Sequence, residues 1–266
     1  MTEITAALVK ELREQTGAGM MACKQALQET GGDLEAARTL LRERGMAAAG
    51  KRADRATTEG IVLVQSHGNE AAIVGVGCET EPVSKNDSFK AFAAKVLEHV
   101  AANGTATSDD LEAERVELIA QLGENIVLVG GKRLEGGTLG SYVHPPANKI
   151  GVLVQLDGGT ADLARQVAMH VSFAAPEYTS RDDVPEETVA AERQIYLNSD
   201  EVQSKPEQAR EKIVDGMLAK RFFAAAPGGA LLEQAWIHDA SKTVGAALEE
   251  AGATVNAFSR VSVAGS

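Results

Sequence analysis

Few residues in this sequence have the type and spacing that covalent chemistry requires. Cys78 would be a nucleophile only with a general base beside it, and no sequence feature places one there. His99 and His170 are expected to pack or to face solvent rather than to catalyse. Gly130-Gly131-Lys132-Arg133 lacks the glycine spacing of a phosphate-binding loop and the Ser or Thr that follows its Lys. The sequence therefore predicts no catalytic residue, no cofactor and no metal ligand.

Composition and charge further narrow the classes of protein to which this chain could belong. Of 266 residues, 44% are hydrophobic and 24% are charged, which is typical of a globular protein with two or three domains. The formal net charge of −12 argues against broad nucleic-acid binding, which needs Lys and Arg to replace counterions. The only cysteines, Cys23 and Cys78, suit a reducing compartment, and Cys23 is expected to be a small buried hydrophobe. Without an apolar signal core or a membrane-length apolar run, a cytoplasmic protein is expected.

The stretch from Cys78 to Asn86 stands out because an internal repeat marks it as an insertion. In each copy an apolar segment is followed by an amphipathic one. Pairing Ile73 with Ile150 gives an offset of 77, whereas pairing His99 with His170 gives 71, so the first copy carries about six extra residues. Loops on a rigid scaffold often hold binding residues, although a longer surface turn would explain the insertion equally well.

Residues 1–55 are predicted to form three short helices, the second over Met20 to Glu29 and the third over Leu34 to Arg44. Gly45 is expected to end the third helix, because glycine is a poor helix former. One of the two methionines that open the second helix, Met20 or Met21, is expected in the core, which leaves the other free for a partner. So small a bundle fits a docking module better than a catalytic unit.

Each copy of the repeat is predicted to be a β-β-α unit. The first unit covers residues 56–135, and its last strand is expected to be interrupted at Gly130-Gly131. The second unit covers residues 136–180 and is completed by a strand within the C-terminal module, 228–266. Two such units predict an antiparallel α+β core with helices on one face.

The segment 181–227 differs from this core because it contains two polar helices. Pro185 suits the first turn of a helix, and Ser204-Lys205-Pro206 separates the two. Their apolar residues, Ile195 among them, are expected to face one another. An antiparallel helical hairpin that projects from the core is therefore predicted.

Several motifs resemble the bacterial elongation factor Ts family. The longest is LREQTGAGMMACKQAL at residues 12–27; GENI at 123–126, GSYVH at 140–144, AMHV at 168–171 and SKTV at 241–244 follow in the family's order. The resemblance covers the whole chain. It implies an α+β fold with a ubiquitin-associated-like (UBA-like) bundle, two related core subdomains, a helical hairpin and a C-terminal module. It also implies that the protein is a guanine-nucleotide exchange factor for elongation factor Tu and not an enzyme that makes covalent bonds.

The resemblance implies contact residues position by position. Thr80, Glu81, Pro82 and Val83 match the family's Thr-Asp-Phe-Val wedge, which pushes into the partner near its magnesium site and loosens the ion. Glu81 keeps the carboxylate one methylene farther out, whereas Pro82 lacks the aromatic ring, whose burial is worth roughly 1.5–3 kcal/mol. The other matches are Arg13, Met20, Met21 and Lys24 in the N-terminal module, His144 in the core, and Ile237 and His238 in the C-terminal module.

Two other classes stay open beside the exchange factor. One is an interaction scaffold whose bundle binds peptides without any effect on nucleotide. The other is a small hydrolase or transferase that uses Cys78, which would need a histidine nearby in the fold. For the exchange factor, the expected partner is elongation factor Tu, GDP-bound and nucleotide-free, with no direct nucleic acid and no membrane.

Overall fold

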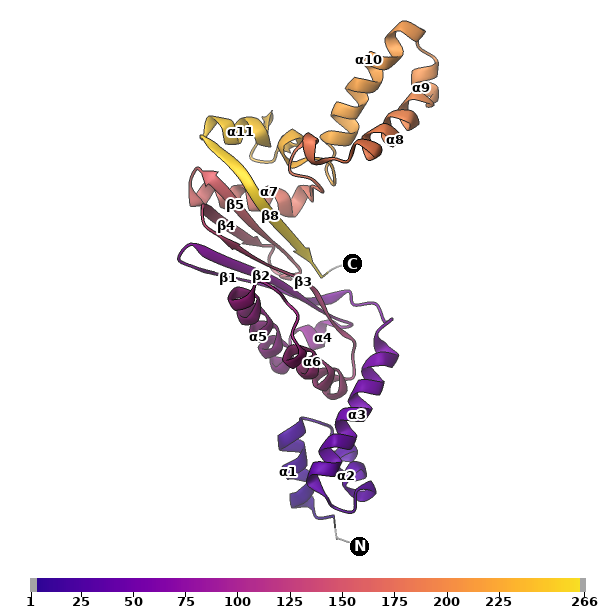
Figure 1. Cartoon of the computed structure of the whole chain (residues 1–266), viewed down its shortest axis with the longest axis vertical. Helices are drawn as coiled ribbons and strands as arrows, with labels where there is room; N and C mark the ends of the chain where they lie inside the picture. The colour runs from indigo at the N-terminus through magenta and orange to yellow at the C-terminus, as the bar shows by residue number, and fades with distance from the viewer. Residues whose placement is uncertain (1–3, 264–266) are drawn as a thin grey trace.

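A computed structural model describes residues 4–263 of the chain. The N-terminal helices, a central core and a helical hairpin follow one another along the long axis of an elongated molecule (Figure 1). The core contains two three-stranded antiparallel sheets, with strand orders β1-β2-β3 and β4-β5-β8. The predicted antiparallel α+β class is confirmed. Across the described range, no helix has the length and apolar character needed to cross a membrane.

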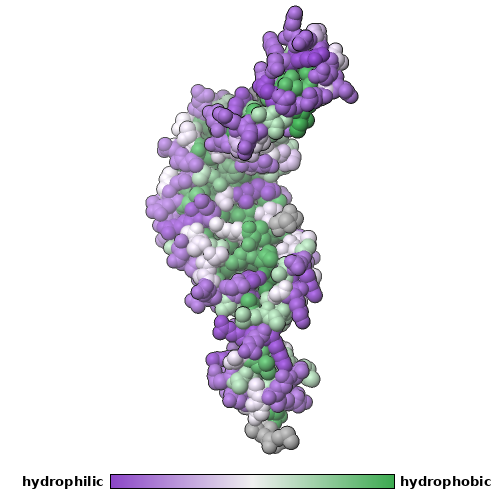
Figure 2. All heavy atoms as spheres, turned by 45° about the vertical axis from the view of Figure 1, so that its right-hand side comes forward, coloured by the Kyte–Doolittle hydropathy of each residue, from purple (hydrophilic) through white to green (hydrophobic). Residues whose placement is uncertain are grey.

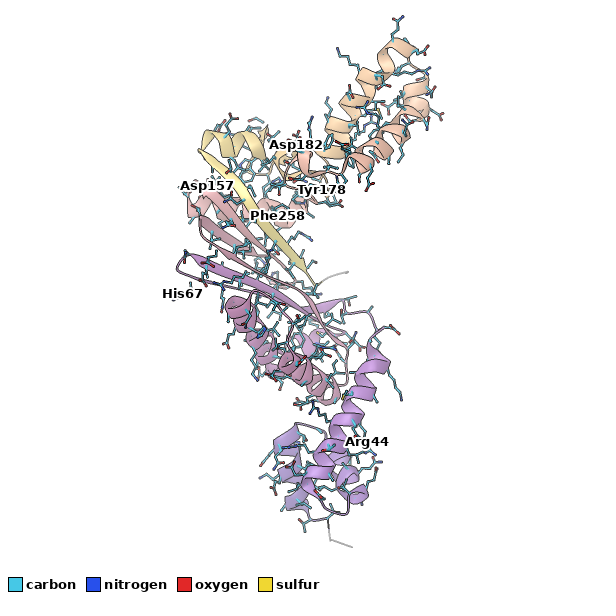
Figure 3. All side chains as sticks on the ribbon, viewed as in Figure 1. Arg44, His67, Asp157, Tyr178, Asp182 and Phe258 are labelled. Atoms are coloured by element: carbon cyan, nitrogen blue, oxygen red, sulfur yellow. The ribbon has the colours of Figure 1, made fainter. Side chains whose placement is uncertain are left out.

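The three N-terminal helices are confirmed as α1 (Ala6–Thr16), α2 (Met20–Glu29) and α3 (Leu34–Arg52). They close around a small apolar core in which Leu12, Cys23 and Leu27 are fully buried. The buried position of Cys23 agrees with its predicted role. Arg44, labelled in Figure 3, forms an ion pair with Glu29 that ties α3 to α2 on the outside of this core.

The prediction that Gly45 ends the third helix is wrong. Helix α3 continues through Gly45 to Arg52 and packs against α6 (Asp109–Leu122). Gly45 is buried in this contact, and a β-carbon built on it would lie 3.3 Å from the β-carbon of Ala120. The glycine therefore lets two helices approach closely, and this packing offsets the roughly 1 kcal/mol by which glycine disfavours a helix.

The first unit forms a sheet that is covered on its outer face by two helices. Its strands are β1 (Glu59–His67), β2 (Glu70–Cys78) and β3 (Ile126–Glu135), and its helices are α5 (Asp87–Asn103) and α6. Phe89, Phe92 and Val96 lie at helical spacing on α5 and pack against the sheet. The first two strands of the predicted β-β-α unit, β1 and β2, pair as an antiparallel hairpin. Strand β3 is continuous, so no break separates two strands at Gly130-Gly131. The predicted irregularity is present as a register shift, because Gly75 pairs with Gly130 whereas Val76 pairs with Leu128.

The second unit repeats this arrangement with a shorter connection. Its strands are β4 (Thr138–Val143), β5 (Ile150–Gly158) and β8 (Ala253–Ser262), and α7 (Ala161–Ala174) and α11 (Val244–Glu250) cover it. The predicted return of the C-terminal strand is confirmed by the pairing of β8 with β5. Residues 79–86 join β2 to α5, whereas residues 159–160 join β5 to α7. The six-residue insertion is therefore confirmed.

The two sheets stack through their inner faces. Val62, Ile73 and Leu134 of the first sheet pack against Leu153 and Val261 of the second. A glycine makes this approach possible, since a β-carbon on Gly151 would lie 2.5 Å from Val62 Cγ1. Helices consequently cover both outer faces of the stack, and the prediction of helices on one face holds only for each sheet taken separately.

The predicted helical hairpin is confirmed as α8 (Glu186–Leu197), α9 (Asp200–Gln203) and α10 (Glu207–Met217). It projects from the core, and its outer surface is mainly hydrophilic (Figures 1 and 2). Val202 and Val214 are buried in its own small core, but Ile195 is exposed, contrary to prediction. Ile195 is one position off the stripe of α8 that faces α10, which explains the difference.

The hairpin leaves the core beside Tyr178 and Asp182 (Figure 3), where Tyr178 forms an isolated bridge with Ala230. After the hairpin, the short strands β6 (Ala235–Trp236) and β7 (Asp239–Thr243) lead into α11. The C-terminal module is thus attached to α7 and to the second sheet.

The α3–α6 contact can be tested with a pair of glycines from one helix. Gly45→Leu should lower the free energy of unfolding by about 1–3 kcal/mol, because the added side chain meets Ala120 and Val116. Gly50→Leu is the control, since a β-carbon on Gly50 has no neighbour within 4 Å and leucine favours a helix. Urea unfolding measures both. Equal effects of the two substitutions would contradict the assigned contact.

Candidate functional site

The six-residue insertion contains a short helix, α4 (Glu81–Ser84), where the sequence predicted a loop. Pro82 lies in the first turn of α4, where a proline has no intrahelical hydrogen bond to lose. Thr80, Glu81 and Pro82 are exposed, whereas Val83 is half-buried against the core beneath α5. We call residues 80–83 the wedge segment. It is anchored by Val83 and presents its other three residues to solvent.

The start of the wedge segment is held by Glu124, to which the sequence assigned no role. Its carboxylate accepts hydrogen bonds from the backbone N–H groups of Glu79 (3.1 Å) and Thr80 (3.0 Å), and from the Thr80 hydroxyl (2.5 Å). In return, the Glu79 carboxylate accepts the backbone N–H of Asn125 at 2.7 Å. The GENI motif at 123–126 was the available signal, because it contains both Glu124 and Asn125.

Within the wedge segment, the exposed carboxylate of Glu81 forms an ion pair with Lys85 at 2.6 Å. The Lys85 hydrogen bond, together with its charge, lowers the pKa of Glu81, so the group is ionised at neutral pH. Because both side chains are well exposed, water screens the pair and it contributes little stability. The carboxylate can therefore exchange Lys85 for another cation at small cost.

Cys78 lies at the base of this segment and is not an activated nucleophile. Its thiol is buried and donates a hydrogen bond to the Thr80 carbonyl at 3.4 Å. Burial, and then the negative charges of Glu124 and Glu59, raise the pKa of Cys78 to about 12. The thiol therefore keeps its proton at neutral pH, and the hydrolase hypothesis lacks the activated thiolate that it requires.

The N-terminal residues matched by resemblance, Arg13, Met20, Met21 and Lys24, are all exposed. The prediction that one methionine lies in the core is wrong, since Met20 is 58% and Met21 74% exposed. Helical side chains point toward the N-terminus, so these first two residues of α2 extend over the preceding turn. The inward face of α2 begins with Cys23.

The residues that the resemblance implies as contacts in the core and the C-terminal module lie partly together in the structure. A surface hollow between β4, α7 and the C-terminal module includes His144 and Ile237 in its lining, and the Tyr142 hydroxyl lies 3.0 Å from His144 Nδ1. Phe173, which the sequence placed only at the end of a helix, also lines the hollow and is 76% exposed. His238 does not line it; its ring packs against Trp236 instead, at a centroid distance of 4.7 Å.

The segment that carries Ile237 is fixed from beneath by His170. Nδ1 of His170 accepts the Ile237 N–H at 3.4 Å, so Nε2 carries the proton and donates to Gln234 Oε1 at 3.0 Å. The Gln234 amide in turn donates to the Ala225 and Gly228 carbonyls at the base of the hairpin. The packing role predicted for His170 is confirmed. Burial lowers the pKa of His170, which favours the neutral ring that this network needs.

The candidate functional residues thus occupy three separate surfaces of an elongated α+β protein: the bundle, the wedge segment and the hollow. Residues 4–263 include no group of three or more His, Cys, Asp or Glu placed to hold a metal ion. The fold and these surfaces define a class of protein whose candidate sites are displayed outward instead of enclosed in a pocket.

Comparison with known proteins identifies the family to which the chain belongs. The sequence model described as Elongation factor TS matches residues 79–265. The chain is 43% identical to Elongation factor Ts of Idiomarina loihiensis, covering 98% of this chain and 91% of that protein. It is 42% identical to the protein of the same name from Erwinia tasmaniensis and 43% to that from Sodalis glossinidius, covering 99% of this chain and 92% of each relative. The chain therefore belongs to the elongation factor Ts family.

The buried His170 predicts a pH dependence of stability. Its folded-state pKa is below the ordinary value of about 6.5, so the unfolded chain takes up a proton first as the pH falls. The free energy of unfolding should therefore decrease from about pH 6.5 downward, and His170→Gln should remove this part of the dependence. Urea unfolding at pH 7.5 and 5.5 measures it.

His99→Gln, at the matching place of the first unit, controls for the loss of a histidine as such. An unchanged pH dependence in His170→Gln would contradict the assignment.

Proposed function

We propose that this chain is a guanine-nucleotide exchange factor for elongation factor Tu, acting during translation elongation in the cytoplasm. Membership of the elongation factor Ts family supports the proposal. The observation that carries it is the wedge segment. Six residues have been added at one strand-to-helix junction of a repeated unit, and they form an exposed, well-anchored projection there.

In the proposed mechanism, the wedge segment acts on the partner's magnesium and phosphate site. The Glu81 carboxylate leaves its weak pair with Lys85 and approaches the cation or its ligands. Pro82 supplies a compact apolar surface in place of the family's aromatic ring, and Val83 anchors it to the core. The stiff φ angle of Pro82 keeps this surface in one position, which compensates in part for its smaller area.

The other two surfaces would hold the partner while the wedge segment acts. Arg13, Met20, Met21 and Lys24 supply charge and adaptable apolar contacts for the partner's nucleotide-binding domain. His144 and Ile237 supply a second contact from the hollow, and His238 follows Ile237 in the chain. Attachment at separated points prevents the partner from rotating away when the wedge segment displaces its ligands.

Thermodynamic linkage states what this exchange requires. A factor that weakens GDP binding by some ratio must itself bind more weakly, by the same ratio, when GDP is present. GDP then dissociates faster from the ternary complex, and GTP replaces the factor by mass action. The factor makes and breaks no covalent bond in this cycle.

Release of fluorescent GDP from purified elongation factor Tu tests the proposal. Rapid mixing with excess unlabelled GDP should show a release rate that rises with the concentration of this protein and then saturates. A scaffold would bind elongation factor Tu and leave the rate unchanged. That outcome would contradict the proposed exchange function.

The two methionines of α2 provide a separate prediction. Replacing both Met20 and Met21 with Ser should weaken binding to elongation factor Tu about tenfold, because each loses part of the roughly 1.5–3 kcal/mol of a buried side chain. The GDP release rate at saturation should change less, since these residues lie outside the wedge segment. Met46→Ser removes another exposed methionine, from α3, and serves as the control. Equal effects of the two variants would contradict a docking role for α2.

A further inference from the structure

We infer that Glu124 is a positioning residue that holds the wedge segment in its active arrangement before any partner binds. This inference rests on the proposed exchange function, because it concerns the same surface. Glu124 would act through Thr80 and Glu79, and it needs no contact with the partner.

The first support is the convergence of three donors on one carboxylate. Strand pairing with β1 ends at Cys78, so the N–H groups of Glu79 and Thr80 lie beyond that ladder. Glu124 accepts both of them and the Thr80 hydroxyl as well. Hydrogen bonds to a carboxylate are shorter and stronger than those to a neutral acceptor. The backbone direction at the start of the wedge segment is therefore set by one side chain.

The second support is the hydrogen bond made by the Thr80 hydroxyl. Thr80 stands at the N-cap of α4, where a threonine hydroxyl normally accepts a hydrogen bond from the helix. The structure shows no such side-chain cap, and the hydroxyl donates to Glu124 instead. The orientation of α4 relative to the core is thus tied to α6 and the turn that follows it.

The third support is that hydrogen bonds hold the two residues on either side of Glu124 in place. Gly123 ends α6 in the left-handed conformation, with its N–H bonded to Ile119 O. Asn125 is 1% exposed, and its side-chain amide donates to the carbonyls of Ala53 (3.3 Å) and Arg55 (2.9 Å). These carbonyls lie in the connection between α3 and β1. One turn therefore fixes the wedge segment and the segment that carries the N-terminal helices.

For nucleotide exchange, the consequence is that the wedge segment is already ordered before it meets the partner. A segment that is already ordered loses less conformational entropy when it docks. Without Glu124, residues 79–83 would retain Val83 as an anchor but would sample other backbone directions. The loss should appear mainly where the position of the wedge segment matters most, in the step that releases GDP.

Three variants test the inference through the GDP release rate at saturating factor. Glu124→Ala should lower this rate about tenfold, equivalent to about 1.4 kcal/mol of activation free energy. Glu124→Gln should recover a large part of it, since the amide oxygen accepts backbone N–H groups and the amide N–H can donate to the Thr80 hydroxyl. Glu114→Ala removes a carboxylate of α6, the helix that precedes Glu124, and should behave as wild type; in the structure this carboxylate pairs with Lys95.

Amide hydrogen exchange supplies a readout that does not depend on nucleotide release. In Glu124→Ala, the amides of Glu79 and Thr80 should exchange faster, while amides in the middle of β2 keep their protection. Thr80→Val should add little to Glu124→Ala in the release assay, because the two side chains share one interaction.

The outcomes separate the two proposals. Wild-type protein that fails to accelerate GDP release contradicts the exchange function, and the hydrogen-exchange result still decides whether Glu124 orders the segment. Active wild-type protein with a folded Glu124→Ala variant of equal rate overturns the inference. Additive effects of Thr80→Val and Glu124→Ala would overturn it as well.

Discussion

The stacking of two small antiparallel sheets is the constraint on which the rest of the structure depends. Each sheet is covered by helices on its outer face only, so its inner face is kept from water by the other sheet. Strand β2 lies in the middle of the first sheet and is buried along nearly its whole length. The wedge segment follows directly from the end of β2. It is therefore attached to one of the most constrained strands of the molecule.

Rigidity and exposure are combined in the same few residues at this junction. Val83 and the Glu124 hydrogen bonds restrain the wedge segment from the core side, while Glu81 and Pro82 face solvent. The hollow follows the same principle, because Ile237 is exposed but its backbone is held by the buried His170. In both places a polar network beneath the surface positions a side chain that is free to touch another molecule.

Periodicity was sufficient to predict the elements that depend on local pattern, such as α5, α7 and the returning strand β8. The offset between Ile73 and Ile150 located the insertion, because an internal repeat supplies its own reference. Apart from the return of β8, contacts between individual residues distant in sequence could not be predicted. The sequence predicted that Gly45 ends a helix, because local pattern does not show that Gly45 packs against α6. Glu124 likewise gains its role only when the end of α6 meets the end of β2.

The most direct measurement is GDP release from elongation factor Tu at saturating factor after residues 80–83 are replaced by Gly-Ser-Gly-Ser. The replacement removes the carboxylate, the proline and the Val83 anchor together, and adds backbone freedom that must be lost on docking. We expect a large fall in the release rate, with a smaller loss of affinity for nucleotide-free partner. A folded variant that releases GDP at the unmodified rate would show that other contacts drive exchange and that this segment is only a long turn.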